Sequence, residues 1–241
     1  MKRVSQLFYY EFSRQHNKAK WEKTMTSTKV IAIVFVIFAL LIGVVGFRLQ
    51  NSNGFNINDL IKDFYTNVVT ELISVAFAIL ILEYLDQQRE LRQNKKHLIH
   101  LLQSKKKDLV NWAIEELRVH GWAFDGTLKN IYLGGADLSY ADLCNFVFTG
   151  SILSEANLFG ADLSQTNLEK TDLSWANLSE ANLNETNLTK ADLQGTNLTK
   201  TNLKEAQLAG ATLLDANLSR ADLYGANLNR TNLRGNNFRG A

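Results

Sequence analysis

A Leu or Phe occupies every fifth position of this chain from Leu133 to Phe238, without interruption. Two residues before most of these centres stands a small side chain, Ala or Thr, and the residue between the two is usually Asp or Asn. Five residues of an α-helix turn through about 500°, so successive Leu side chains would scatter around the axis and form no apolar stripe. The five-residue period therefore argues against an α-helix in this half of the chain.

The same period predicts a coiled β-structure. In a flat strand the faces alternate with period two, so residues five apart point to opposite sides. The small residue and the centre of every unit can face the same interior only if the chain bends once per five residues. Four bends per coil would stack each Leu on the Leu twenty residues later, with coils about 4.8 Å apart. Each coil would then bury its apolar face against its neighbours.

Units such as ADLSY, ANLFG, ADLSQ and ANLNR resemble the pentapeptide-repeat family. The resemblance covers Leu133 to Ala241 and implies an all-β solenoid, a right-handed quadrilateral β-helix. It implies a fold and no activity, because members of that family have varied roles. Two apolar segments, a basic helix and then the repeats resemble a prokaryotic membrane-anchored subtype of the family with two N-terminal transmembrane helices.

Two apolar segments precede the repeats. Residues 30–47 contain no charged residue and are long enough to span about 30 Å of hydrocarbon. A second stretch, residues 64–85, is mostly apolar but includes Glu71 and Glu83. We expect residues 30–85 to form a hairpin of two transmembrane helices, joined by a short outside loop at residues 51–60.

Basic residues predict the orientation of this hairpin. Seven Lys or Arg precede the first span and seven follow the second by residue 107, whereas the connecting region offers only Arg48 and Lys62. The positive-inside rule then places both termini and the solenoid in the cytoplasm. We expect a multi-pass protein of the bacterial inner (plasma) membrane, with residues 1–29 as a basic cytoplasmic tail. The aromatic residues of that tail either contact the membrane interface or belong to a frayed end.

Residues 86–130 are expected to form a cytoplasmic helical linker and an N-terminal cap for the repeats at 131–241. A charged helix would run over residues 83–103, and Ser104 would cap a second helix that Gly121 ends. The face of this second helix would carry Leu109, Ala113, Ile114 and Leu117. Apolar bulk for the first coil would come from Trp122, Phe124, Leu128 and Ile131. A cover is expected because a solenoid end exposes strand edges and core Leu.

The sequence shows no constellation that carries chemistry. It has no Gly-rich phosphate loop and no nucleophile elbow. His97 and His100 lie three apart on a predicted helix without a third metal ligand, and the single Cys144 excludes an intrachain disulfide. We therefore expect no catalytic residue, no cofactor and no metal, and a protein that is not an enzyme. The repeated Asp and Asn are expected to serve turns and backbone.

Residues twenty apart would form columns on the solenoid surface. One column reads Gly150, Lys170, Lys190, Gly210 and Arg230, and another reads Asn145, Gln165, Glu185, Glu205 and Gly225. Like charges about 5 Å apart repel one another, so these columns do not serve stability. The candidate interaction surface therefore comprises Lys170, Lys190, Arg230, Glu185 and Glu205. Residues 133–241 carry a net charge of only −4 with basic residues interspersed, so we do not expect nucleic acid as a partner or DNA mimicry as a role.

Two hypotheses for function remain. The first is a membrane-anchored, non-enzymatic scaffold whose cytoplasmic solenoid binds a protein, with the lipid bilayer and an unknown cytoplasmic or membrane protein as partners. The alternative is an accessory or regulatory subunit of a membrane complex that acts through its transmembrane helices.

Two further features carry hypotheses. Repeats continue to the last residues, so the final coil would expose Leu233 and Phe238. A second copy meeting it end to end about a two-fold axis would cover both, and a frayed monomeric end is the alternative. Glu71 is an intramembrane acid, which is functional, or extends outward to the membrane surface, or pairs with Arg48.

Overall fold

A computed structural model of the chain describes residues 34, 37, 41 and 57–241, with side chains described for the first three and from residue 67 onwards. It separates into two compact units, Met1–Leu91 and Arg92–Ala241. The predicted tail at 1–29, the first span at 30–47 apart from three helical positions, and residues 51–56 of the predicted loop lie outside the described residues.

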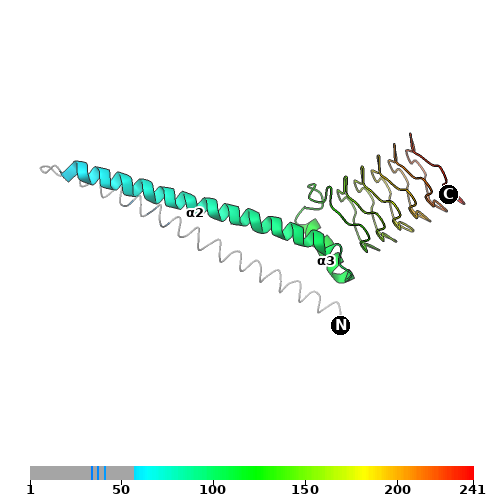
Figure 1. Cartoon of the computed structure of the whole chain (residues 1–241), viewed down its shortest axis with the longest axis horizontal. Coiled ribbons are helices and arrows are strands. Elements are labelled where there is room, and N and C mark those ends of the chain that lie inside the picture. Colours follow the sequence, from blue (N-terminus) through cyan, green and yellow to red (C-terminus); the bar gives the residue numbers. More distant parts are fainter. Residues whose placement is uncertain (1–33, 35–36, 38–40, 42–56) are drawn as a thin grey trace. The chain divides into compact units, whose positions relative to one another are not determined.

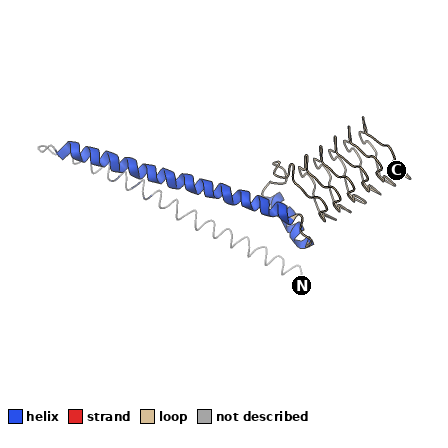
Figure 2. Ribbon diagram, in the orientation of Figure 1, coloured by secondary structure: helices blue, strands red, loops and turns tan. Residues whose placement is uncertain are grey.

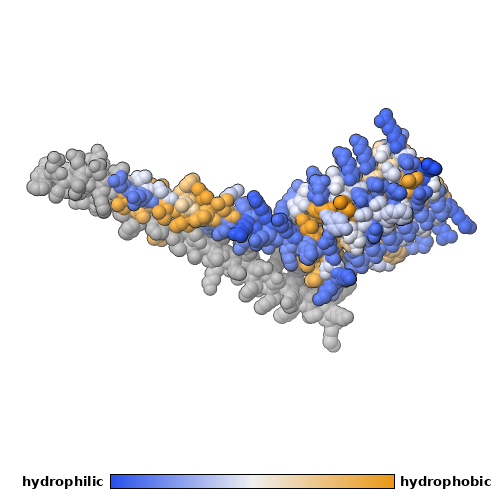
Figure 3. Space-filling model, viewed as in Figure 1, coloured by the Kyte–Doolittle hydropathy of each residue, from blue (hydrophilic) through white to orange (hydrophobic). Residues whose placement is uncertain are grey.

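Helix α2 runs from Ile57 to Leu101 (Figure 1). The loop predicted for residues 51–60 is therefore wrong for 57–60, which are helical. Within the described residues one helical stretch, Asn67–Leu101, is long and apolar enough to cross a membrane. Apolar residues gather along the middle of α2 in the space-filling view (Figure 3). Large apolar side chains are exposed there, including Ile73, Phe77 and Leu82. The charged helix predicted from residue 83 is the continuation of α2.

Helix α3 spans Lys107–Val119 and corrects two predictions. Its N-cap position is Lys106, without a side-chain cap, and the Ser104 hydroxyl instead accepts a hydrogen bond from the Lys106 N–H at 3.2 Å. Leu109, predicted on the buried face, is 38% exposed, and Val110 takes its place. The remaining predicted residues of that face are buried: Ala113, Ile114 and Leu117. Gly121 adopts φ +72° directly after the C-cap residue, as predicted for a helix end.

The repeats form the predicted solenoid with twenty residues per coil. Parallel bridges join the residue before each centre to the one twenty positions later, from Tyr132 with Ile152 to Asn217 with Asn237. Successive coils are visible as stacked turns from green to red in Figure 1. Because each pairing is an isolated bridge between turns, Figure 2 draws the coils without arrows. The centres from Leu133 to Leu218 donate their N–H groups to the next coil, as Leu133 does to the Ile152 carbonyl at 2.7 Å.

The four corners of each coil depend on a left-handed residue. The carbonyls of the centres from Leu133 to Leu228 accept the N–H three residues later, as Leu138 does from Ala141 at 3.1 Å. The second residue after the centre, the corner residue, has positive φ: +55° at Tyr140 and +57° at Glu185. This conformation is costly for β-branched side chains. No Val, Ile or Thr occupies a corner from residue 135 to residue 240.

The core is a continuous stack of centres and small residues. The centres from Leu133 to Leu218 are buried, and the small residues two before them pack between coils. Where that residue is Thr, its hydroxyl donates to the carbonyl of a centre in the preceding coil, as Thr166 does to Leu143 at 2.8 Å. Thr therefore replaces Ala inside the core without leaving an unpaired polar group.

The cap shares this core. Buried side chains of α2, of the residue that follows it and of α3 belong to the same cluster as the first centres: Leu98, Leu102, Val110, Ile114 and Leu117. Trp122 and Leu128 are buried there as predicted, whereas Phe124 is 46% exposed and makes an edge contact with Phe146. Ser151 donates to the Leu128 carbonyl just as each Thr does to its centre. The repeat pattern thus begins at Leu128.

Candidate interaction surface

The solenoid presents four walls. Each wall comprises one stack of centres, together with the two residues before and the two residues after every centre. Wall 1 has the centres Leu133, Leu153, Leu173, Leu193, Leu213 and Leu233. Wall 2 has Leu138, Leu158, Leu178, Leu198, Leu218 and Phe238. Wall 3 has Leu143, Leu163, Leu183, Leu203 and Leu223. Wall 4 has Phe148, Leu168, Leu188, Leu208 and Leu228. Four walls follow one another around each twenty-residue coil, so wall 1 is opposite wall 3.

Asp and Asn before the centres serve the backbone, as predicted. Their Oδ1 atoms accept the N–H two residues later, as Asn177 does from Ser179 at 3.3 Å. On walls 2, 3 and 4 the Asn side chains also donate hydrogen bonds to the equivalent side chain of the preceding coil, and together these bonds form a ladder along the wall. Asn177 donates to Asn157 at 3.2 Å, and Asn197 donates to Asn177 at 3.3 Å. Wall 1 has no such ladder among the described residues, because its corresponding positions include Ile152, Asp172 and Asp192.

Charge is separated by wall. Wall 1 has four carboxylates and one Arg, and wall 3 has five carboxylates and one Lys, so these opposite walls carry net charges of −3 and −4. Walls 2 and 4 carry +1 and +2. Acidic and basic surfaces therefore alternate around the solenoid.

The predicted interaction residues occupy the corner columns of walls 3 and 4. Lys170 pairs with the neighbouring Glu169 at 3.1 Å, and Lys190 and Arg230 have no ion pair within the described chain. On wall 3, Glu185 accepts hydrogen bonds from Gln165 at 3.0 Å and Asn184 at 3.1 Å. Each column is thus an ordered row of side chains, but the two columns lie on different walls and form no common site.

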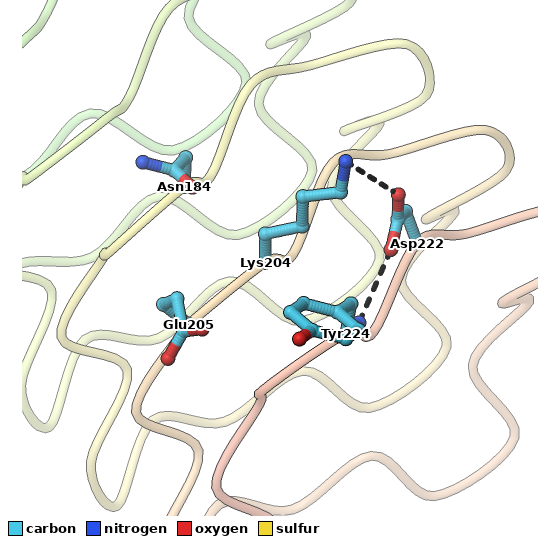
Figure 4. A pocket seen from close by; sticks show the side chains of 5 residues that line it. All are labelled: Asn184, Lys204, Glu205, Asp222 and Tyr224. Carbon is cyan, nitrogen blue, oxygen red and sulfur yellow. Dashed lines mark hydrogen bonds and ion pairs between the residues drawn. The ribbon is translucent and has the colours of Figure 1, made fainter.

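A shallow depression of about 570 Å³ lies on wall 3 (Figure 4). Its lining residues are Asn184, Lys204, Glu205, Asp222 and Tyr224. Lys204 Nζ lies 3.1 Å from Asp222 Oδ2, and the Tyr224 N–H donates to Asp222 Oδ1 at 3.1 Å. The backbone hydrogen bond from Tyr224, aided by Lys204, lowers the pKa of Asp222 below 3.8. Lys204 and Asp222 therefore neutralise each other.

Two basic residues of α3 bind the first coil, a contact that the sequence did not reveal. Lys107 donates to the Ser139 carbonyl and to its hydroxyl at 3.2 Å, and lies 3.9 Å from Asp137 Oδ1. Arg118 Nη2 donates to the Asp142 carbonyl at 2.8 Å and lies 2.9 Å from Asp142 Oδ1. These contacts fix the cap against walls 2 and 3.

One feature of the sequence indicates these contacts: the first coil has an Asp where later coils have Asn. Later coils of wall 2 place Asn at the ladder position, from Asn157 to Asn237, whereas the first coil has Asp137. The first residue of a ladder has no Asn in a preceding coil to which it could donate a hydrogen bond. A carboxylate at that position can instead pair with a basic side chain of the cap. Lys95 makes a comparable contact with Asp125 at 3.1 Å and lies 5.1 Å from the Trp122 ring centroid.

These contacts change the ionisation of the groups involved. Hydrogen bonds from Ser139, supported by Lys107, hold the pKa of Asp137 below 3.8 although burial opposes this. Burial acts to raise the pKa of Asp142, but the hydrogen bonds from Arg118 and the Cys144 N–H outweigh it and lower that pKa below 3.8.

Removal of the Asp142 carboxylate is expected to reduce the acid sensitivity of the cap. A carboxyl with a lowered folded pKa stabilises the fold above pH 3.8, and this contribution is lost as the pH falls through the folded value. Asp142→Asn should therefore lower the unfolding free energy of fragment 92–241 by about 0.5 kcal/mol at pH 7, discounted for exposure. The difference should narrow below about pH 4. Thermal melts of both proteins across this range measure it. Asp215→Asn, at a carboxylate without an ion pair among the described residues, is the control, and a difference independent of pH would contradict the assignment.

The remaining predicted residues are placed as follows. At the C-terminal end, Leu233 is partly buried and Phe238 is 40% exposed, so the end-to-end dimer stays a prediction. Glu71 is exposed on α2 without an ion pair among the described residues, and Arg48 lies outside them. Cys144 is a free thiol near Asn145 and Ser164. Within the described residues, no group of three or more His, Cys, Asp or Glu is placed to hold a metal ion.

The family model of pentapeptide repeats matches residues 128–165, 166–204 and 201–240, in eight copies. Through these residues, the chain belongs to the pentapeptide-repeat family. No curated protein matches the chain.

Several solved pentapeptide-repeat structures are similar to it. HetL from Nostoc sp. PCC 7120, a pentapeptide-repeat protein involved in heterocyst differentiation regulation, is 32% identical with a TM-score of 0.34. That match covers 45% of this chain and 58% of HetL, so the chain spans little more than half of that protein. Rfr23 from Cyanothece 51142 is 26% identical with a TM-score of 0.46, covering 52% of this chain and 96% of Rfr23. A pentapeptide-repeat protein of the Arabidopsis thaliana thylakoid lumen is 32% identical over 44% of this chain and 67% of its own, with a TM-score of 0.32.

Proposed function

We propose that this pentapeptide-repeat protein is a membrane-anchored, non-enzymatic scaffold whose solenoid binds a partner protein in the bacterial cytoplasm. The observation that carries the proposal is the ordered surface of the repeats. Side chains are regularly spaced on four walls of a rigid backbone. The Asp and Asn before the centres are fixed by hydrogen bonds within the turns and between the coils. Such a surface offers recognition by shape and charge, as solenoids commonly do.

The exposed apolar residues of α2 support the membrane anchor. Ile73, Phe77 and Leu82 are each more than half exposed, which water would disfavour over so long a stretch. Lipid would cover them, and the basic residues that follow, Arg89 and Arg92, would then lie on the cytoplasmic side. The two-helix hairpin with its partner span at 30–47 belongs to this proposal.

Deletion of the repeats tests the proposal against the alternative of an accessory subunit that acts through its helices. The full chain and a variant ending before residue 128 would be expressed with an N-terminal tag, and proteins crosslinked in intact membranes would be compared by quantitative mass spectrometry. We expect the specific partners to be lost by at least about tenfold on deletion, a change of about 1.4 kcal/mol. Partners retained by the shortened chain would support the accessory-subunit hypothesis instead. Both variants should remain in the membrane fraction, and release of either into the soluble fraction would contradict the anchor.

A further inference from the structure

Wall 1 carries four carboxylates that no basic residue neutralises. Glu155, Asp172, Asp192 and Asp215 form no ion pair within the described part of the chain. The two in mid-wall, Asp172 and Asp192, each accept hydrogen bonds only from the residue two positions later, through one oxygen. They face each other across one coil spacing, about 4.8 Å. An Asn at either position would keep the hydrogen bond to the residue two positions later and replace this repulsion with a ladder bond, as on wall 2, so the fold does not require the two negative charges.

Wall 3 is more acidic in sequence but differs in this respect. Asp142 is bound by Arg118, Asp222 by Lys204, and Glu185 by two amides. The negative charge of wall 3 is therefore partly neutralised within the chain, whereas that of wall 1 is available to a partner.

An exposed indole stands among the wall 1 carboxylates. Trp175 is a corner residue and is 62% exposed. Its ring lies over Gly195 of the next coil, because a Cβ at Gly195 would approach the Trp175 Cε3 atom to 2.5 Å. The absence of a side chain at Gly195 thus allows the ring to lie along the wall. Exposed Trp residues are enriched at the centres of protein interfaces.

The indole and the carboxylates are arranged for a cationic segment. Along the corner column the order is Glu155, Trp175, Gly195 and Asp215, so acidic side chains stand about 5 Å before and about 10 Å beyond the Trp175 position. Asp172 and Asp192 lie beside it on the flat of the wall. A guanidinium can stack on an indole face while its N–H groups bond carboxylates, which an ammonium does less well.

We propose that wall 1 binds a basic, arginine-containing segment of a partner protein, with one arginine stacked on Trp175 and neighbouring basic side chains paired with Asp172 and Asp192. This inference rests on the proposed scaffold function and specifies its binding wall and partner chemistry. An extended segment fits because the carboxylates are spread along successive coils.

A labelled synthetic peptide in which arginine alternates with glycine is the probe. Its binding to the purified full-length protein in detergent would be followed by fluorescence anisotropy at low and physiological salt. Trp175→Ala and the double variant Asp172→Asn/Asp192→Asn should each weaken binding by about tenfold, whereas Trp175→Phe should retain part of it. The control Asp162→Asn/Glu205→Gln removes two charges from wall 3 and should change binding by less than about twofold. A lysine-for-arginine peptide should bind more weakly than the arginine peptide.

Each outcome is decisive. Equal losses in the wall 1 and wall 3 double variants would show general attraction to an acidic rod and overturn the inference, as would full binding by Trp175→Ala. The same wall 1 variants, introduced into the membrane crosslinking experiment, separate this inference from the scaffold proposal. Partners lost on deletion of the repeats but retained by Asp172→Asn/Asp192→Asn would leave the scaffold in place and overturn wall 1 as its binding surface.

Discussion

Replacement of Leu183 by Asp is expected to unfold the solenoid. Leu183 is fully buried in a middle coil, between Leu163 and Leu203 of the same stack. The variant loses about 1.5–3 kcal/mol of apolar burial, and an unpaired charge in a dry stack adds several kcal/mol. The sum approaches the entire stability of an ordinary domain. Fragment 92–241, which has its own core, should therefore show no cooperative melt by circular dichroism near 218 nm.

Two outward-facing substitutions serve as controls for Leu183→Asp. Glu185→Ala lies two positions further along at an exposed corner, and Leu214→Asp makes the same chemical change one residue after a centre. Both should shift the unfolding free energy by about 0.5 kcal/mol or less. If Leu183→Asp and the controls melted alike, the assignment of inward and outward positions would be incorrect.

Replacement of Leu117 by Asp is expected to detach the cap. Leu117 on α3 is fully buried in the cluster that also holds the first centres. Loss of its packing costs about 2–5 kcal/mol, and the buried carboxylate adds to this. The first coil would then lie open, so the amide protons of Leu133, Leu138 and Leu143 should exchange at least about a hundredfold faster. Hydrogen exchange of fragment 92–241 measures these protons directly, since each donates to the second coil.

The same helix supplies the matched control for the cap. Leu109→Asp makes an identical change at a side chain that is 38% exposed, and it should leave exchange in the first coil nearly unchanged. Uniform acceleration along the whole solenoid in Leu117→Asp would show that coils unfold together, and would contradict a cap that acts chiefly on its neighbour. Exchange unchanged in every coil would show that the cap contributes no stability.

The difference between Leu109 and Val110 illustrates what could be predicted and what could not. Five-residue periodicity determines the solenoid because each centre must meet the centre twenty residues later, so Leu183 could be placed inside without a structure. A short helix is less constrained, but the i, i+3, i+4, i+7 spacing of Val110, Ala113, Ile114 and Leu117 already favours Val110 over Leu109 on the buried face. The contacts of that face with the first coil, in contrast, are not contained in the sequence spacing.

The candidate surface shows the same limit. Spacing alone identified the columns of Lys170 and Glu185, because residues twenty apart must stack. It did not distinguish charges bound within the chain from those left unpaired, since that depends on the direction of each side chain. The orientation of Trp175 over Gly195 and the pairing of Arg118 with Asp142 both arise between segments, and neither follows from the repeat. The left-handed corners were detectable, however, from the absence of β-branched residues there.

The twenty-residue register also restricts how such a chain can change in length. An insertion of five residues keeps every Leu inside but moves all later residues to the next wall. Carboxylates of walls 1 and 3 that follow the insertion would then lie on the basic walls. A duplication of twenty residues adds about 4.8 Å and leaves every wall in place. An insertion of one or two residues turns all later centres outward unless a bulge absorbs it. Lengthening by whole coils is therefore the only change that extends the rod and preserves the pattern of charges on its sides.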